Sequence, residues 1–322
     1  MTRISNAPGS VPIREAVSVL KRGGLVAFPT ETVYGLGADA SNPAAVARIY
    51  KIKGRPESHP IIVHIGDTGQ LARWAREVPE GARKLAARFW PGPLTLVLKR
   101  APGVGDELTG GEDTIGLRMP NHPVALELLR QFGGGIAAPS ANKFGRISPT
   151  TAEHVRNDLG DEVDLILDGG PCEIGIESTI VDLSRDRPVL LRPGRIGAGD
   201  IAATLDATPE PRDRSAPRAP GTLESHYAPR HPLRLIPSGE WDETLRAASL
   251  SRAVLCFRAR PVGKRYAIWI RASTDPQHCA RDLYSNLRTL DASGCDEILV
   301  EEPPTSTEWA AVRDRLLRAR SA

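Results

Sequence analysis

The chain has 322 residues, of which 40% are hydrophobic and 25% charged, as in an ordinary globular protein. Its 42 basic against 39 acidic side chains give a net charge of +3, too small an excess to indicate nucleic-acid binding, although a local cluster of cations could still hold phosphate. The length favours two domains over one. The four cysteines are scattered without a Cys-x-x-Cys pair, which argues against a zinc site or a disulfide framework.

Neither a signal segment nor a membrane span is predicted. The N-terminal residues 1–14 contain Pro8, Gly9 and Pro12 and lack an apolar signal core. Elsewhere no uninterrupted apolar run approaches the ~20 residues that a membrane-spanning helix needs. Together with the scattered cysteines, these features predict a cytoplasmic protein with reduced thiols.

The first two thirds of the chain alternate between helical and strand patterns. Apolar residues recur at helical spacing from Ile13 to Lys21 and stop at Gly23-Gly24. Further helices are expected at Ala44–Tyr50, Ala82–Phe89, Pro123–Gln131 and Thr151–Leu159. Strands are expected at Leu25–Phe28, Ile61–Ile65, Leu94–Leu98, Ile115–Arg118, Ile136–Ala138, Leu165–Leu167, Thr179–Leu183 and Val189–Leu191. This interleaving predicts a layered α/β domain.

A proline-rich segment separates this domain from a second one. Between Ala207 and Pro232 prolines and arginines dominate and apolar periodicity disappears, as in a semi-rigid linker. Beyond it, strands are expected at Leu233–Ile236, Ala253–Phe257, Ala267–Ile270 and Glu297–Val300, and helices at Asp242–Ala248, Pro276–Leu290 and Trp309–Arg318. We therefore predict a larger α/β domain over residues 13–200, a linker over 201–232 and a small α/β domain over 233–322.

The segment Lys51-Ile-Lys-Gly-Arg-Pro56 places three cations within five residues. Cations this close repel one another, so clustering them is costly unless an anion lies among them. Their place at the end of a predicted helix gives a plainer reason for part of the cluster, because cations suit a helix C-terminus. The chain has no Gly-x-x-x-x-Gly-Lys-Ser/Thr loop, so a phosphate site here would be built from other loops.

Several motifs occur together in one order. They are Pro29-Thr-Glu-Thr-Val-Tyr-Gly-Leu36, Lys51-x-Lys-Gly-Arg-Pro56, Trp90-Pro-Gly-Pro-Leu-Thr95, Ile115-Gly-Leu-Arg-Met-Pro120, Ala138-Pro-Ser-Ala-Asn142, Ser178-Thr-Ile-Val-Asp182, Leu191-Arg-Pro-Gly194 and Ser225-His-Tyr-Ala-Pro229. In this order they resemble the YrdC-like family, in the longer two-domain form of its threonylcarbamoyl-AMP synthases. The resemblance implies an open, twisted, mixed sheet with helices, joined by the Pro-rich linker to a smaller Rossmann-like α/β domain. No Gly-x-Gly-x-x-Gly is present, so the second domain need not bind a dinucleotide.

The resemblance also implies which residues contact ATP. They are Lys53, Arg55, His59, Thr114, Ser140, Asn142, Ser148, Arg192 and Tyr227. Lysines supply point charge and arginine forks supply paired phosphate contacts, so Lys53, Arg55 and Arg192 are the candidate catalytic residues. Taken alone, Arg192 could equally be a solvated arginine in a turn, and Ser140 and Asn142 could serve only to form their turn.

The same resemblance implies a threonine site. Its residues are Thr32, His64, Arg118, Ala138 through its backbone, and Ser178. A single histidine in an aliphatic strand is more often a satisfied core residue, and Arg118 could form a structural ion pair. Its position at the end of a strand, where open α/β sheets bind ligands, favours a role in the site.

His59 departs from the family pattern, in which asparagine is common at this position. A histidine there could still donate a hydrogen bond to phosphate, but its protonation would make ATP binding sensitive to pH near neutrality. Replacing His59 by asparagine should then flatten the pH dependence of the ATP KM.

The activity that the resemblance implies joins L-threonine, bicarbonate or carbon dioxide, and ATP into threonylcarbamoyl-AMP and pyrophosphate, with Mg²⁺ bound mainly through the phosphates. The product would serve N6 modification of adenosine 37 in tRNA through a separate transferase. The linker is a candidate lid, with His226 and Tyr227 reaching back over the site, because a labile adenylate needs protection from water. A solvated tether fits its composition as well.

Two other functions remain open on the residues alone. An RNA-binding module would use a basic concave face to hold tRNA or double-stranded RNA, but only 5% of the residues are aromatic, which disfavours base stacking. Another carbamoyl or nucleotidyl transfer would fit the same site. The carbamoyltransferases that carry this module also have zinc-finger segments, and the scattered cysteines here do not match these.

Overall fold

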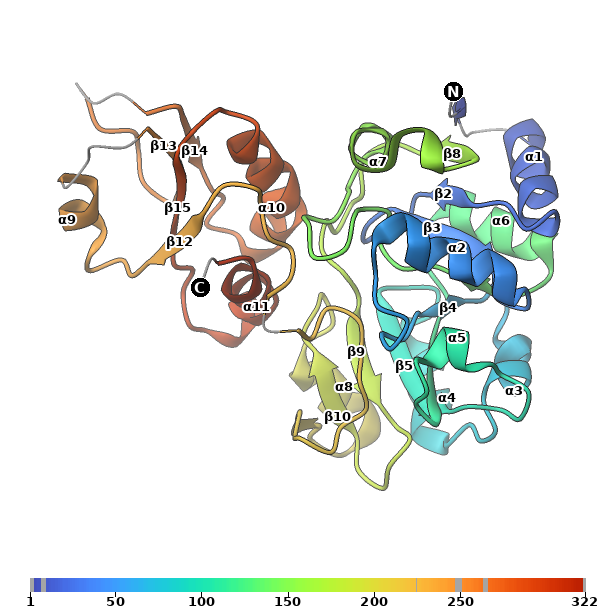
Figure 1. Cartoon of the computed structure of the whole chain (residues 1–322). Coiled ribbons are helices and arrows are strands. Elements are labelled where there is room, and N and C mark those ends of the chain that lie inside the picture. Colours follow the sequence, from blue (N-terminus) through green and yellow to red (C-terminus); the bar gives the residue numbers. More distant parts are fainter. Residues whose placement is uncertain (1–2, 7–9, 224, 247–250, 263–265, 321–322) are drawn as a thin grey trace. The chain divides into compact units, whose positions relative to one another are not determined.

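The computed structural model describes residues 3–6, 10–223, 225–246, 251–262 and 266–320 (Figure 1). The chain divides into two compact units. The first comprises residues 1–144 and 149–222, and the second comprises residues 145–148 and 223–322. The short loop 145–148 therefore leaves the first unit to pack within the second.

The first unit is built on a mixed sheet. Among the described residues it has eleven strands in the order β1-β8-β2-β3-β7-β4-β6-β5-β9-β10-β11. Their bounds are β1 Arg3–Asn6, β2 Val26–Phe28, β3 Gly35–Asp39, β4 Val63–His64, β5 Leu94–Lys99, β6 Thr114–Arg118, β7 Ile136–Ala137, β8 Leu165–Asp168, β9 Thr179–Asp182, β10 Val189–Arg192 and β11 Glu210–Pro211. Parallel pairs such as β4 with β6 alternate with antiparallel pairs such as β5 with β6, which confirms the predicted mixed sheet.

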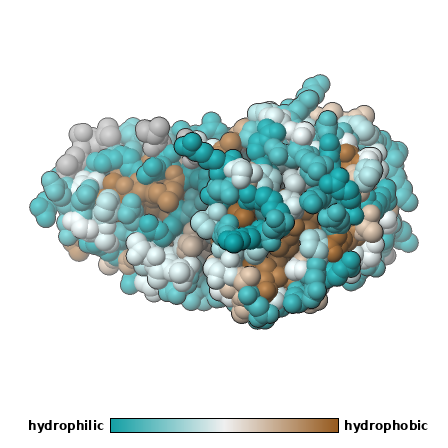
Figure 2. Space-filling view, turned by 90° about the horizontal axis from the view of Figure 1, so that it is seen from below, coloured by the Kyte–Doolittle hydropathy of each residue, from teal (hydrophilic) through white to brown (hydrophobic). Residues whose placement is uncertain are grey.

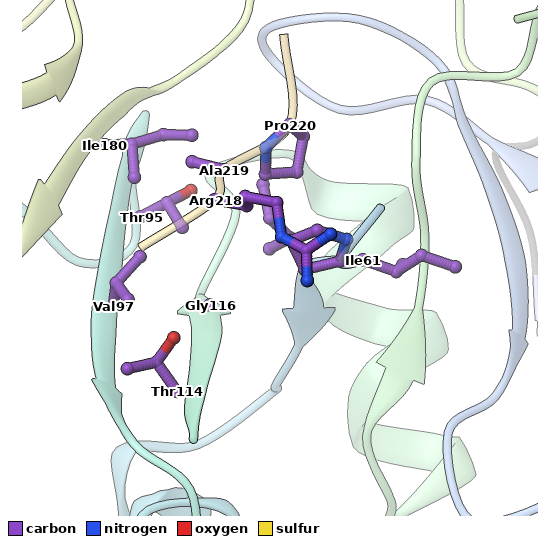
Figure 3. Close-up of a pocket in the computed structure, with 11 residues that line it drawn as sticks. Ile61, Thr95, Val97, Thr114, Gly116, Ile180, Arg218, Ala219 and Pro220 are labelled. Atoms are coloured by element: carbon purple, nitrogen blue, oxygen red, sulfur yellow. The ribbon is translucent and has the colours of Figure 1, made fainter. Parts of the chain in front are cut away.

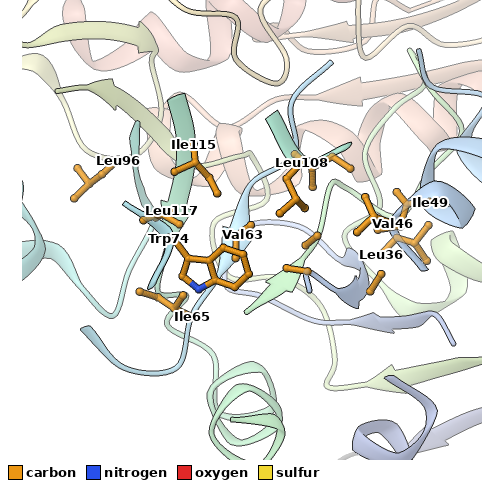
Figure 4. Packing of buried hydrophobic residues seen from close by; sticks show 14 of the residues in the cluster. Leu36, Val46, Ile49, Val63, Ile65, Trp74, Leu96, Leu108, Ile115 and Leu117 are labelled. Atoms are coloured by element: carbon orange, nitrogen blue, oxygen red, sulfur yellow. The ribbon is translucent and has the colours of Figure 1, made fainter. Parts of the chain in front are cut away.

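Helices cover both faces of this sheet. They are α1 Ser10–Lys21, α2 Pro43–Lys53, α3 Leu71–Trp74, α4 Glu80–Phe89, α5 Asp106–Thr109, α6 Pro123–Phe132, α7 Ala152–Leu159 and α8 Ala198–Leu205. Apolar residues of α1 and α6 pack against β2, β7 and β8 on one face. On the other face, residues of α2, α3, α4 and α7 enclose the larger core, in which Trp74 lies beside Val63 and Leu117 (Figure 4).

Caps at both ends of helix α2 fix the position of the cation cluster at its C-terminus. The side chain of Asn42 caps its first turn by accepting from the N–H of Ala45, and Pro43 fits the first helical position because that position needs no N–H donor. Gly54 ends the helix with φ +63°, a left-handed conformation that favours glycine. The helix was predicted to end at Tyr50, and it instead extends through Lys53.

Most predicted elements are confirmed within a few residues, and three differences matter. The strand expected at Ile61–Ile65 is reduced to Val63–His64, because its first residues hydrogen-bond to Leu108 in the short helix α5 and to Ala138. Strand β3 was not predicted, since its Gly-Leu-Gly sequence lacks strand formers. The segment predicted as linker begins inside helix α8.

The second unit contains a smaller sheet. Its four described strands are β12 Leu233–Ile236, β13 Arg252–Cys256, β14 Ile268–Arg271 and β15 Glu297–Glu301, all parallel and in the order β12-β15-β13-β14. Helices α9 Trp241–Arg246, α10 Pro276–Asp291 and α11 Ala310–Ala319 accompany it. This confirms the predicted small Rossmann-like domain. Residues 247 and 248 of the predicted helix Asp242–Ala248 lie outside the described residues.

The surface is mostly polar. Figure 2 shows hydrophilic residues over much of one side of the molecule, with apolar residues gathered in patches. None of the described helices combines the length and the apolar character needed to cross a membrane.

Candidate active site

Strand alternation separates the core of the first unit from a polar surface. Along β6, Ile115 and Leu117 point into the large core, whereas Thr114, Gly116 and Arg118 point to the opposite face. The same two-residue period recurs in the three strands nearest to β6. On that opposite face it places His64 of β4, Thr95 and Val97 of β5, and Ile180 of β9. Ser178, which directly precedes β9, lies on the same face.

A small pocket of about 10 Å³ lies over this face. It is lined by Pro60, Ile61, Ile62, Thr95, Val97, Thr114, Gly116, Ile180, Arg218, Ala219 and Pro220. Figure 3 shows Arg218, Ala219 and Pro220 on a segment that crosses the pocket near the strand residues Thr95 and Val97. This volume is far below the roughly 300 Å³ or more of small-molecule sites, because the segment fills space that a nucleotide would need.

Apolar packing and a hydrogen bond hold the covering segment in place. Ala216 and Ala219 belong to a small apolar cluster with Ile62, Val97, Ile180, Val189 and Leu191. The carbonyl of Pro220 accepts a hydrogen bond from Nη1 of Arg192 at 2.8 Å. The predicted linker up to residue 222 therefore belongs to the first unit.

Lys53 is buried, with 3% of its surface exposed. Its Nζ donates to the carbonyls of Ser140 and Asn142 at 2.6 and 2.5 Å. Burial, with the nearby Arg55 as the next cause, lowers the pKa of this ammonium well below its usual value. Lys53 thus joins the end of α2 to the Pro-Ser-Ala-Asn loop and brings three predicted ATP-binding residues together.

Arg55 and His59 lie at the pocket's edge. Arg55 donates from Nη2 to the carbonyl of Pro60, a pocket residue, at 2.9 Å. Both side chains contact Phe144: the Arg55 guanidinium lies 5.5 Å from the ring centre, and the His59 ring meets it edge-on at 5.3 Å. Burial and the charges of Arg55 and Arg218 lower the pKa of His59, so its titration lies on the acid side of its usual value and further from neutrality than predicted.

Arg118 forms a buried ion pair with Glu31, a partner that was not predicted from the sequence. Its Nη2 lies 2.8 Å from Oε1 of Glu31, and both side chains are at most 5% exposed. His64 pairs with Arg118 in the β4–β6 ladder and is equally buried. Burial, and then the charge of Arg118, lower the His64 pKa to about 3, so this ring is neutral at physiological pH. Glu31 lies between Thr30 and Thr32 in the first motif. Its negative charge within this motif was the only sequence feature that could have indicated a partner for Arg118.

Ser178 is the centre of a hydrogen-bonded group. Its hydroxyl lies 2.8 Å from that of Thr95 and 3.1 Å from Nη2 of Arg192, and its carbonyl accepts from Nε and Nη2 of Arg192. Arg192 is 3% exposed, so it is a buried organising residue and not a solvated turn arginine.

Two further residues predicted to bind threonine, Thr32 and Ala138, are buried. The hydroxyl of Thr32 lies 2.8 Å from that of Thr30. The N–H of Ala138 donates to the carbonyl of Ile62 at 3.0 Å, so a backbone contact from Ala138 to a ligand would use its carbonyl.

Ser148 and Tyr227, both predicted to bind ATP, belong to the second unit. The loop 145–148 packs there against the segment that carries Tyr227, since Ala228 donates to the carbonyl of Gly145. Tyr227 is buried beneath Arg315 and beside Tyr284, with φ +62°. His226, the other predicted lid residue, meets the Tyr227 ring edge-on at 4.2 Å.

Within the described residues no three His, Cys, Asp or Glu side chains are grouped as metal ligands. The cationic residues around the pocket instead suit an anion. The arrangement can therefore bind a phosphorylated ligand beside a small polar molecule held by Arg118, His64 and Ser178.

Comparison with known families gives matches over most of the chain. A family model described as telomere recombination (Sua5, YciO, YrdC) matches residues 18–194. A second model, described as the C-terminal domain of threonylcarbamoyl-AMP synthase, matches residues 196–321.

Relatives that match over nearly their full length are named threonylcarbamoyl-AMP synthase. The chain is 41% identical to threonylcarbamoyl-AMP synthase of Pyrococcus abyssi, with 95% of this chain and 93% of the relative covered. It is 40% identical to the Bacillus subtilis synthase, with 95% and 92% covered. The crystal structure of P. abyssi Sua5 complexed with L-threonine matches with a TM-score of 0.91 at 38% identity, covering 99% of this chain and 97% of that one.

Proposed function

Because the chain belongs to the threonylcarbamoyl-AMP synthase family in its long two-domain form, we propose that it makes threonylcarbamoyl-AMP from L-threonine, bicarbonate and ATP. The reaction is a nucleotidyl transfer. The observation that supports it most is the polar face of β4, β5, β6 and β9, where buried cations and hydroxyls meet beside a pocket.

In this proposal threonine binds near Arg118. The guanidinium would hold the amino acid's carboxylate, and the neutral His64 would donate or accept a hydrogen bond without adding charge. Ser178 and Thr32 would read the hydroxyl of threonine. A buried site that hydrogen-bonds a hydroxyl discriminates strongly, because an analogue without it leaves the protein's polar groups unpaired.

ATP would bind alongside, with Lys53, Arg55 and Arg192 supplying positive charge. Lys53 and Arg192 hold the loop at Ser140 and the strand end at Ser178 in this structure. Their role would then be to position the walls of the site as well as to stabilise the charge on the reacting phosphate. Thr114 and Ser140 would line the nucleotide, and we assign the same role to His59, Asn142, Ser148 and Tyr227.

Two bond-forming steps account for the product. The amine of threonine forms a C–N bond with carbon dioxide, supplied as such or from bicarbonate, and loses a proton to give an N-carboxylate. An oxygen of this carbamate then attacks the α-phosphorus of ATP, and the bond to the β-phosphate oxygen breaks as pyrophosphate leaves. Alignment and electrostatic stabilisation suffice for these steps, without a covalent enzyme intermediate.

Mg²⁺ would enter as part of the substrate. The described residues offer no cluster of metal-ligating side chains, which fits an ion held chiefly by the phosphates of ATP. When bound, it supplies neutralising charge to the phosphate oxygens.

The covering segment would act as the lid of the site. Arg218, Ala219 and Pro220 line the pocket, so ATP entry would require the segment to move, and its return would exclude water from a labile product. The contribution of His226 and Tyr227 to this closure stays a prediction. We further propose that the product passes to a separate transferase for tRNA modification, and that any direct contact with tRNA or double-stranded RNA is secondary.

Pyrophosphate release tests the proposal. The protein should release pyrophosphate from ATP only when both bicarbonate and L-threonine are present, and much more slowly with L-serine or L-valine. Folded protein that shows no threonine-dependent release would contradict the proposal, and steeply salt-dependent RNA binding in its place would favour the RNA-binding alternative.

A further inference from the structure

Arg218 comes from the covering segment and lines the pocket together with Thr114. Its Nε lies 2.5 Å from Oε1 of Glu112, and its Nη2 donates to the carbonyl of Gly110 at 2.9 Å. We propose that Arg218 binds the β- and γ-phosphates of ATP and exchanges Glu112 for them when the nucleotide enters. This inference rests on the proposed function and adds a substrate-binding residue to it.

The position of Arg218 along the sheet favours the phosphate tail. Thr114 and Arg118 stand at opposite ends of β6, which places them roughly 13 Å apart at the usual rise per residue. The α-phosphate must lie close to the threonine that attacks it, and we place that threonine at Arg118. Arg218 and Glu112 lie at the Thr114 end, where the part of ATP beyond the α-phosphate would extend.

The local charges favour an anion at this end. Arg55 donates to the carbonyl of Pro60 and Arg218 lines the pocket beside Pro60. The positive charges of Arg55 and Arg218 both act on His59, the residue next to Pro60. Two guanidinium groups that converge on one short turn repel each other, and a polyphosphate between them would remove this repulsion.

The ion pair with Glu112 is suited to exchange. The Arg218 and Glu112 side chains are 47% and 25% exposed, and ion pairs this exposed to solvent contribute little to stability. Phosphate oxygens accept two parallel hydrogen bonds from a guanidinium and bind it more strongly. The segment itself is held independently, by the contact of Arg192 with Pro220 and by the packing of Ala219. Arg218 can therefore change partner while the segment stays ordered.

Three single variants separate this proposal from a purely structural latch. Arg218→Gln removes the charge, and Glu112→Gln removes the competing partner but leaves Arg218. Arg187→Gln is the matched control, because Arg187 is an exposed arginine of the same unit that is paired with Glu210 at 2.8 Å. Calorimetry on the full-length proteins would give the Kd of α,β-methylene-ATP, which cannot release pyrophosphate, and the Kd of AMP, which lacks the phosphate tail.

We expect Arg218→Gln to weaken α,β-methylene-ATP binding about tenfold, as loss of a charged hydrogen bond does, and to change AMP binding less than about twofold. Glu112→Gln should tighten α,β-methylene-ATP binding about two- to fivefold, and Arg187→Gln should change neither Kd. Equal weakening of both nucleotides by Arg218→Gln, weakening by Glu112→Gln, or unchanged binding in Arg218→Gln would each overturn the proposal. Absent pyrophosphate release in the wild type would instead count against the proposed function, since these binding measurements do not depend on turnover.

Discussion

The two units of this protein bury charged side chains in different ways. In the second unit, Arg252 pairs with Glu297 at 2.7 Å and Arg315 pairs with Asp314 at 2.7 Å, so cation and carboxylate neutralise each other. In the first unit, the hydrogen bonds described above for Lys53 and Arg55 run to backbone carbonyls, and those of Arg192 run to carbonyls and to the Ser178 hydroxyl. Arg118, paired with Glu31, is the exception in this unit. A carbonyl satisfies a donor but carries only a partial charge.

This difference separates a structural from a functional use of buried charge. Paired charges in the second unit are explained by the fold alone, because each needs its partner once it is removed from water. Cations held by carbonyls keep most of their positive potential and therefore favour an anionic ligand. The comparison assigns the chemistry to the first unit and leaves the second unit's buried pairs as supports of its own fold.

The largest expected effect comes from Lys53→Met. The variant removes a buried positive charge and the donor that joins two carbonyls of the 138–142 loop. The kcat of pyrophosphate release should fall by about 100-fold or more, as when one electrostatic stabiliser of a reacting phosphate or oxyanion is lost.

Its matched variant in the second unit is Arg252→Met. This change leaves Glu297 buried with only the weaker contact to Arg234 and should lower the free energy of unfolding by about 3 kcal/mol. The kcat of the folded protein should stay within about twofold of the wild type. A fall in kcat comparable to that of Lys53→Met would break the distinction between the units.

The next effect concerns acid stability. The His64 pKa is about 3 in the folded protein and about 6.5 when unfolded, so the unfolded state takes up a proton first as the pH falls. The contribution of His64 to the free energy of unfolding is therefore fully present above pH 6.5. It is lost as the pH falls from 6.5 to 3, and the loss is on the order of 5 kcal/mol. His64→Asn should flatten this part of the stability curve, measured by urea unfolding at several pH values.

The smallest effect is expected at His59. Its lowered pKa keeps the ring neutral at pH 7, and protonation below the ordinary value of 6.5 adds a positive charge that attracts ATP. The ATP KM should therefore fall as the pH is lowered below 6.5, and His59→Asn should remove this trend. An identical pH profile in the variant would show that His59 does not contact the nucleotide.

Periodicity predicted the scaffold well because burial enforces it. The alternation in Leu94–Leu98 and Ile115–Arg118 indicated β5 and β6, and the same alternation places Arg118 on the site face. Strand β3 was missed because glycine has no strand preference of its own, and only its pairing with β2 and β7 makes Gly35–Asp39 a strand.

The site was predictable where motifs fix residue identity, but not where partners come from distant segments. Lys53 and Arg118 stand out in their motifs, yet the carbonyls that bind Lys53 and the Glu31 that pairs with Arg118 are tertiary contacts. Arg218 was hidden in a segment whose prolines and charges predict a linker. Its place on the pocket depends on the apolar contacts of Ala216 and Ala219, two residues too small to create a periodic signal.

The most direct test of the central claim is the fate of the carbon from bicarbonate. The protein would be incubated with ATP, L-threonine and ¹³C-bicarbonate, and the products would be separated and their masses determined by mass spectrometry. We predict a product that contains AMP, threonine and one ¹³C-labelled carbonyl carbon, formed in step with pyrophosphate. A product of threonine joined directly to AMP without the label, or no threonine-containing nucleotide at all, would contradict the account.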